Sequence, residues 1–246
     1  MGTVDSPIIK TATDGPHFTG RRITLALTVN IEGIDGSGKG TQAKLLQEHL
    51  QASGARVRLF SFPRYDETLF GKGIGDFLNG RFGKLDQVSP FLAALLYAGD
   101  RFESRELLQE AIRDHDYVIL DRYVASNIAH QASKLTGDER REAIEWITRI
   151  EHEIYGLPHP DLTILLNLPP QQAQELIAKK APRNYTTSAA DIQESDSSYL
   201  QQVHEMYLEI AAGNERWRVI DCIQGDAIRT IEDVAAEVRG CVAAAR

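Results

Sequence analysis

Four glycines and a lysine stand close together in residues 31–42, which read Ile-Glu-Gly-Ile-Asp-Gly-Ser-Gly-Lys-Gly-Thr-Gln. The spacing of Gly33, Gly38 and Lys39 is that of a phosphate-binding loop, which connects a strand to a helix. Glycine lets the backbone approach phosphate oxygens closely, and N–H groups at a helix start attract their charge. An ordinary tight turn is the alternative. The pattern favours nucleoside triphosphate binding and phosphoryl transfer through the loop residues Gly33, Asp35, Gly36, Ser37, Gly38, Lys39, Gly40 and Thr41.

Two residues of this loop depart from a plain phosphate cradle. Gly40 occupies the position where Ser or Thr usually ligates Mg²⁺ directly. Mg²⁺ would then rely on water, phosphates and carboxylates, a mixed shell that it accepts readily. Asp35 lies inside the loop, where a carboxylate would repel a bare phosphate. We therefore expect Asp35 to contact a sugar hydroxyl or Mg²⁺.

Further polar residues follow two predicted strands. Arg64 comes after the second strand and Arg122 after the third, and ligands gather beyond the carboxyl ends of parallel strands. The planar fork of arginine suits phosphate oxygens, although a single arginine is more often a solvated charge. Asp121 closes the third strand, where a carboxylate can orient Mg²⁺ or cap the following helix. Both roles of Asp121 stay open, and they are compatible.

The elements that must position these residues alternate along the chain. Apolar or alternating runs predict strands over residues 23–32, 55–62, 117–120, 162–168 and 217–222. Helical periodicity predicts helices over residues 43–52, 68–79, 88–114, 124–134, 138–155, 193–212 and 227–244, with a further helix starting at Pro169-Pro170. This alternation predicts an α/β fold of the P-loop NTPase type, with a central five-stranded parallel sheet flanked by helices.

Composition limits the organisation and the partners. The 246 residues carry a formal net charge of −8, so we expect no general basic surface for nucleic acid. No run approaches the ~20 apolar residues of a membrane span, and residues 1–20 lack the apolar core of a signal peptide. Cys222 and Cys241 have no metal-ligand spacing and suit a reducing cytoplasm. We expect a flexible extension over residues 1–21 and one cytoplasmic domain over residues 22–246, with no membrane partner.

Several segments together resemble the thymidylate kinases, a branch of the P-loop nucleoside monophosphate kinases. The Asp-Arg-Tyr-x-x-Ser motif is more specific than the loop, and the likeness covers roughly residues 23–239. The matching segments are Glu32-Gly33-Ile34-Asp35-Gly36-Ser37-Gly38-Lys39, Phe62-Pro63-Arg64-Tyr65, Tyr97-Ala98-Gly99-Asp100-Arg101, Asp121-Arg122-Tyr123-Val124-Ala125-Ser126-Asn127, Asp191-Ile192-Gln193-Glu194 and Tyr207-Leu208-Glu209.

The resemblance implies phosphoryl transfer from ATP to dTMP, giving dTDP and ADP in pyrimidine deoxynucleotide synthesis. It implies that Arg64 and Arg122 hold the acceptor phosphate and that Asp35 lies near the sugar hydroxyl and the metal. It further implies stacking of Tyr97 on the thymine ring, although core packing is the alternative for this residue. The remaining acceptor residues that it implies are Phe62, Tyr65, Arg101, Ser126, Asn127 and His130, with Arg101 and Asn127 bonding the polar edge of the base.

The same resemblance implies a mobile lid over about residues 179–192. Branches of the family place a catalytic arginine either in the phosphate-binding loop or in this lid. Ser37 occupies the loop position here, so the candidate cations are Lys179, Lys180 and, first of all, Arg183. The catalytic set implied is Lys39, Asp35, Arg122 and Arg183. Mg²⁺ would be held by Asp35, Asp121 and Glu194, partly through water, and a homodimer is expected because dimers are common in the family.

Three departures from the family pattern leave the acceptor open. Gly40 lacks the usual hydroxyl, the lid is poor in arginine, and His130 stands where the family commonly has tyrosine. The smaller histidine could leave room for a 2′-hydroxyl, so a dUMP or UMP kinase is one alternative. A non-catalytic nucleotide-binding regulator is another, although the guanine-reading Asn-Lys-x-Asp motif is absent.

Overall fold

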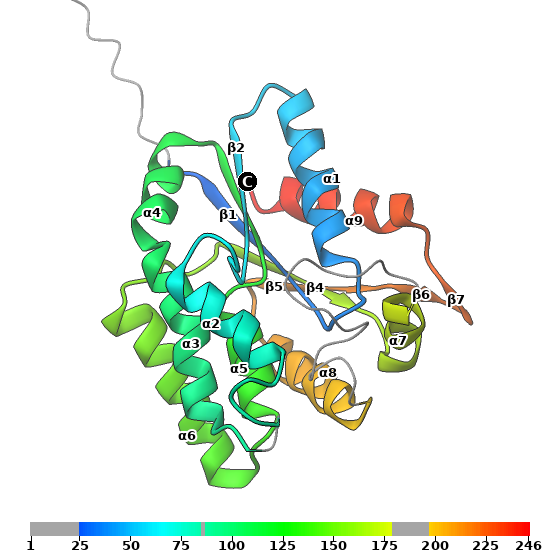
Figure 1. Ribbon diagram of the computed structural model, residues 1–246. Coiled ribbons are helices and arrows are strands. Elements are labelled where there is room, and N and C mark those ends of the chain that lie inside the picture. The colour runs from blue at the N-terminus through cyan, green and yellow to red at the C-terminus, as the bar shows by residue number, and fades with distance from the viewer. Residues whose placement is uncertain (1–24, 85–86, 179–196) are drawn as a thin grey trace, which may run out of the picture.

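The computed structural model describes residues 25–84, 87–178 and 197–246 (Figure 1). Several expectations fall outside these ranges. They are the N-terminal extension, the start of the first strand, the lid cations Lys179, Lys180 and Arg183, and the metal candidate Glu194.

A five-stranded parallel sheet forms the centre of the molecule, as predicted (Figure 1). Its strands are β1 (Leu27–Glu32), β2 (Val57–Ser61), β3 (Tyr117–Asp121), β4 (Leu162–Asn167) and β5 (Trp217–Asp221). Their order across the sheet is β2-β3-β1-β4-β5. The register pairs Asp121 with both Ile31 and Ser61, so β1, β2 and β3 end at the same edge. The loops that follow these strands therefore meet at that edge.

Helices cover both faces of the sheet (Figure 1). One face carries α1 (Lys39–Ala52) and α9 (Ile231–Ala244), and the other carries α3 (Pro90–Glu103), α5 (Val124–Ala132) and α8 (Ser197–Ala211). The remaining helices are α2 (Leu69–Leu78), α4 (Arg105–Asp114), α6 (Gly137–Thr148) and α7 (Pro170–Ala178). Strands β3 and β4 are buried, as their apolar runs predict, and they lie on either side of the central strand β1. Among the described residues, no helix is both long and apolar enough to cross a membrane.

The single helix predicted over residues 88–114 is wrong, because α3 ends at Glu103 and α4 begins at Arg105. Ser104, between them, is fully buried, and its hydroxyl donates to the Asp100 carbonyl at 3.0 Å. A serine that bonds back to the preceding turn bends a helix. The Ser104 hydroxyl also accepts a hydrogen bond from Arg64 at 2.8 Å. Arg64 follows β2 and is distant in sequence, so helical periodicity could not predict this contact.

Two further helix predictions need correction. The helix expected over residues 227–244 begins at Ile231, because Thr230 caps it by accepting from the Asp233 N–H. The residues before it form a hairpin of β6 (Ile223–Gln224) and β7 (Ala227–Ile228) that we did not predict. The helix expected over residues 138–155 is α-helical only to Thr148 and continues as the π-helix η1 (Arg149–Ile154).

Candidate active site

The phosphate-binding loop has the predicted strand–turn–helix context. Gly36 and Gly38 have φ angles of 87° and 88°, in the left-handed region that favours glycine. A Cβ on Gly36 would lie 2.5 Å from the Ala173 carbonyl oxygen of α7, so the loop packs too closely there for a side chain. Gly38 is the N-cap of α1, whose first residue is Lys39. The loop therefore ends at the positive end of a helix dipole, where anions bind.

Lys39 is buried at the floor of this loop. Its Nζ atom donates to the Ile34 carbonyl at 2.7 Å, which holds the side chain back along its own loop. Burial, and next the positive charge of Arg122, lower the pKa of Lys39 to about 7. Asp35 and Asp121 act in the opposite direction. An anionic phosphate bound in the loop would therefore stabilise the charged form of Lys39.

Arg122 forms an ion pair with Asp35 across the sheet edge. Its Nη2 atom lies 2.6 Å from Asp35 Oδ1, and its Nη1 atom donates to the Ser126 hydroxyl at 3.1 Å. Its φ angle of 68° is unusual for a residue other than glycine, and such conformations gather at functional sites. Burial acts to lower the pKa of Arg122, but Asp35 together with Tyr207, Glu32 and Asp121 outweighs burial, so the pKa is raised. The guanidinium is thus a fixed cation beside the loop.

Glu32 holds the segment that carries Arg122 through hydrogen bonds, a role that we did not predict from the sequence. Its carboxylate is fully buried. Five hydrogen bonds reach it, from the side chains of Asn30, Ser126 and Tyr207 and from the backbone N–H groups of Tyr123 and Ser126. Because these donors come from β1, from the turn after β3, from α5 and from α8, Glu32 joins the loop to the Asp-Arg-Tyr-x-x-Ser segment. Its position directly before Gly33 was the available signal.

A cavity of about 330 Å³ opens beside these residues. Nine of the ten residues predicted for the acceptor site line it: Asp35, Phe62, Tyr65, Tyr97, Arg101, Arg122, Ser126, Asn127 and His130. The predicted metal ligand Asp121 lines it as well. Sequence reasoning missed four residues that also line it, Ser61, Pro63, Leu78 and Gln131. Polar groups and aromatic rings thus share one cavity at the carboxyl edge of the sheet, where α/β proteins bind ligands.

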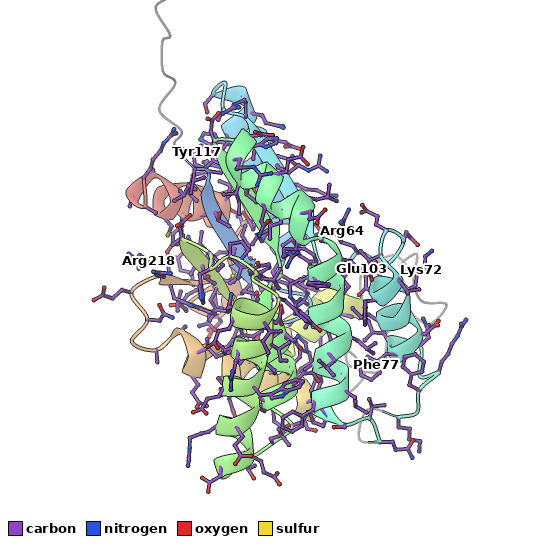
Figure 2. All side chains as sticks on the ribbon, turned by 90° about the vertical axis from the view of Figure 1, so that its left-hand side faces the viewer. Arg64, Lys72, Phe77, Glu103, Tyr117 and Arg218 are labelled. Carbon is purple, nitrogen blue, oxygen red and sulfur yellow. The ribbon has the colours of Figure 1, made fainter. Side chains whose placement is uncertain are left out.

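Arg64 is the predicted acceptor residue that does not line this cavity. Its Nη1 atom donates to Ser104, and its Nη2 atom pairs with Glu67. Glu103, the last residue of α3, accepts from the first N–H groups of α2 (Figure 2). In this conformation Arg64 therefore connects the β2 end to the break between α3 and α4.

The far end of the cavity holds the buried residues Arg101, Asn127 and His130. Arg101 forms a two-point ion pair with Glu151 of η1, and Asn127 donates to the same carboxylate. His130 Nδ1 lies 2.9 Å from the Tyr199 hydroxyl, and its ring meets Tyr207 edge-on. Burial is the main reason that the pKa of His130 falls to about 3. The imidazole is therefore neutral at physiological pH, which suits contact with a sugar better than contact with a phosphate.

Carboxylates at this edge fit the needs of Mg²⁺. In the described ranges, no three His, Cys, Asp or Glu side chains gather into a complete metal site. Mg²⁺ commonly takes one or two carboxylates and completes its shell with phosphates and water. Asp35 and Asp121 both line the cavity and can supply those carboxylates. A Cβ on Gly40 would lie 3.1 Å from Asp121 Oδ2, so this carboxylate closely approaches the position of the missing hydroxyl.

Comparisons with known proteins agree on one family. The family model described as thymidylate kinase matches residues 31–237. The thymidylate kinase of Mycobacterium tuberculosis (strain ATCC 25618 / H37Rv) is 36% identical over 196 residues, which are 79% of this chain and 91% of that protein. A probable thymidylate kinase of Thermococcus gammatolerans is 31% identical over 223 residues, 89% of this chain and 96% of that protein.

A solved structure supports the same relationship. The thymidylate kinase from Candida albicans, described as having broad substrate specificity, superposes with a TM-score of 0.68 at 26% sequence identity. The match covers 89% of this chain and 92% of the Candida chain.

Proposed function

This chain belongs to the thymidylate kinase family, and we propose how its described residues divide the work of transferring a phosphoryl group from ATP to dTMP. The reaction gives dTDP and ADP. The observation that carries the proposal is a cavity lined by Asp35 of the phosphate-binding loop, by residues of the Asp-Arg-Tyr-x-x-Ser segment, and by aromatic residues from the end of β2 and from α3. A donor site and an acceptor site must adjoin for a direct transfer between two nucleotides.

The loop binds the phosphates of ATP. Backbone N–H groups at Gly36, Gly38 and the start of α1 surround them, and Lys39 adds a charge on the outer oxygens. Because Lys39 is buried and has a lowered pKa, binding of a phosphate favours its charged form. A preorganised cation of this kind stabilises the charge that develops on the transferred group.

Arg122 orients the phosphate of dTMP. Asp35 and Ser126 fix two nitrogens of its guanidinium, so it needs little rearrangement when a nucleotide binds. Asp35 is also close enough to the cavity to meet the sugar hydroxyl. Arg64 takes part only if its side chain leaves Ser104 and Glu67, and we propose that it does so when the acceptor phosphate enters.

The thymine ring occupies the aromatic end of the cavity. Tyr97 stacks on it, with Phe62 and Tyr65 closing the sides, and stacking on a base contributes roughly 1–3 kcal/mol. Arg101 and Asn127 bond its polar edge, and His130 packs near the sugar. The position of each of these residues on the cavity wall supports the proposed roles.

Asp121 and Asp35 would hold Mg²⁺ together with the phosphates of ATP. When bound, the metal supplies charge neutralisation between the two outer phosphates. We also propose that Arg183 provides the closing cation and Glu194 a further metal contact, although both lie outside the described residues.

A homodimer and a cytoplasmic location complete the proposal. The helices α3 and α4 expose the large apolar residues Leu92, Phe102 and Leu107, which a second copy could cover. The cysteines Cys222 and Cys241 are free, in keeping with a reducing compartment. Light scattering of the purified chain tests the dimer.

A coupled assay of ADP release tests the reaction. The purified protein is mixed with ATP and, in separate runs, dTMP, dUMP, UMP or dCMP. We expect dTMP to give the highest kcat/KM. ADP release that no monophosphate accelerates would refute the kinase, and a preference for UMP would refute the thymidylate assignment.

A further inference from the structure

Arg101 and Asn127 form what we call the base end of the cavity. Glu151 contacts both residues but does not itself line the cavity. It belongs to the π-helix η1, and its side chain is fully buried. Its Oε2 atom accepts from Arg101 Nε at 2.5 Å. Its Oε1 atom accepts from Arg101 Nη2 at 2.6 Å and from Asn127 Nδ2 at 2.8 Å. One carboxylate thus connects the two residues at the base end, which come from α3 and α5.

These contacts permit only one orientation of the Asn127 side chain. Its Nδ2 atom donates to two groups that can only accept, the Ala94 carbonyl at 3.0 Å and the Glu151 carboxylate. Turning the amide over would place its oxygen against both acceptors. The oxygen Oδ1 is left buried and without a hydrogen-bond partner in the described part of the chain. Asn127 can therefore offer a ligand an acceptor and no donor.

Glu151 limits Arg101 in the complementary way. It accepts from Nε and from one N–H group of Nη2, which leaves the N–H groups of Nη1 and the second one of Nη2 to donate to a ligand. Burial acts to lower the pKa of Arg101, but Glu151 together with Asp100 and Tyr123 outweighs burial, and the pKa is raised. Arg101 therefore keeps its charge and can only donate.

We propose that Glu151 is a positioning residue that selects the base, because it fixes Arg101 as a donor and Asn127 as an acceptor. This inference rests on the proposed function and deepens it. Thymine presents a carbonyl acceptor beside an N–H donor, and the fixed pair complements it. Cytosine presents an amino donor beside a ring-nitrogen acceptor, so each contact would oppose like with like. A buried polar group left unpaired in this way is costly, and such sites reject the wrong ligand strongly.

A purely structural role for Glu151 makes a different prediction. If the carboxylate only neutralises a buried arginine, its loss weakens every acceptor to the same extent. If it sets the order of donor and acceptor, its loss changes the ratio between acceptors. The ratio of kcat/KM for dTMP to kcat/KM for dCMP therefore separates the two roles.

The experiment is the substitution Glu151→Gln, assayed with ATP and either dTMP or dCMP. Glutamine keeps the size of the side chain but brings its own N–H group, so only the Ala94 carbonyl still holds the Asn127 amide in its orientation. We expect the dTMP-to-dCMP ratio to fall by about tenfold or more. Glu153→Gln, the same change on the exposed side of η1, is the matched control and should leave the ratio unchanged. Equal losses for both acceptors in Glu151→Gln would overturn the proposal.

A measurement on the unmodified protein covers the case in which Glu151→Gln does not fold. With ¹⁵N-labelled asparagine, hydrogen exchange of the Asn127 side-chain amide is compared with that of the exposed Asn214. We expect the Asn127 hydrogens to exchange at least about tenfold more slowly, with and without dTMP, because both are held by protein acceptors. Equal exchange rates would overturn the proposal. A wild-type protein inactive with every monophosphate would instead refute the function, which separates the two failures.

Discussion

Gly40 lies directly against the Asp121 carboxylate: a Cβ on Gly40 would be only 3.1 Å from Asp121 Oδ2. The position that usually carries a metal-ligating hydroxyl is therefore close to a carboxylate from the end of β3. We infer that Asp121 takes over part of the metal contact that a Ser or Thr would make, and that glycine leaves it the necessary room.

Gly40→Ser should therefore impair the enzyme, although it restores the common residue. The new Cβ would press on the Asp121 carboxylate, and we expect the Mg²⁺ concentration for half-maximal ADP release to rise by about threefold to tenfold. Gly40→Ala serves as the control, because it adds the Cβ without the hydroxyl and should behave alike. A Gly40→Ser enzyme that reaches half-maximal ADP release at a lower Mg²⁺ concentration than wild type would contradict this account.

Lys39→Ala should lower kcat by about 10²–10³-fold, because it removes a preorganised charge from the transferred phosphoryl group. Steady-state kinetics at saturating ATP and dTMP measure the effect. Lys44→Ala, on the exposed side of the same helix, is the matched control and should retain the wild-type rate. Unaltered kcat in Lys39→Ala would remove this lysine from the mechanism.

His130→Tyr should sharpen discrimination against ribonucleotides. A larger ring beside the sugar would crowd the 2′-hydroxyl, and differences of this kind amount to about 1–3 kcal/mol. Because dUMP and UMP differ only in that hydroxyl, the ratio of their kcat/KM values is the measurement. We expect the ratio to rise by about tenfold relative to wild type. A ratio that stays the same would mean that residue 130 does not contact the sugar.

His130 should also make the protein less stable in acid. Its pKa is about 3 in the folded chain against an ordinary value of 6.5, mainly because of burial. Below the ordinary pKa the unfolded chain takes up a proton that the folded chain does not, so stability is lost as the pH falls from about 6.5 toward 3. Between pH 7 and pH 5 this amounts to about 2 kcal/mol of unfolding free energy. Urea unfolding of wild type and His130→Phe measures it.

The comparison uses the change in unfolding free energy between pH 7 and pH 5. The unfolding free energy at pH 7 is not used, because His130→Phe also loses the contact with Tyr199. The variant should lose about 2 kcal/mol less than wild type over that interval. Equal losses in the two proteins would show that His130 titrates normally.

Glu32→Ala should destabilise the fold and not only the site. It would leave several buried donors without an acceptor, and each such group costs about 1–3 kcal/mol. We expect calorimetry to show a fall of several degrees or more in Tm. Glu48→Ala, at an exposed position of α1, is the control. A Glu32→Ala protein that melts with wild type would contradict the role assigned to this carboxylate.

Local patterns predicted the parts of the fold that depend on local chemistry. The glycines of the loop, the apolar runs of β3 and β4 and the polar residues at strand ends carry their own signals. The structure brings the polar residues Asp35, Asp121 and Arg122 to one cavity. Contacts between residues that are distant in sequence could not be predicted from local patterns. Ser104 breaks a helix in contact with Arg64, and Glu151 reaches Arg101 and Asn127 through a π-helical turn. The capping pair Thr230 and Asp233 was a local signal that could have placed the start of α9.

The most direct test of the central claim is a competition in one vessel. ATP is mixed with equal concentrations of dTMP, dUMP, UMP and dCMP, and the diphosphates are separated and quantified as the reaction proceeds. We predict that dTDP accumulates first and that ADP forms with it in equal amount. Earlier accumulation of UDP, or ATP consumption without any nucleoside diphosphate derived from the acceptors, would contradict the account.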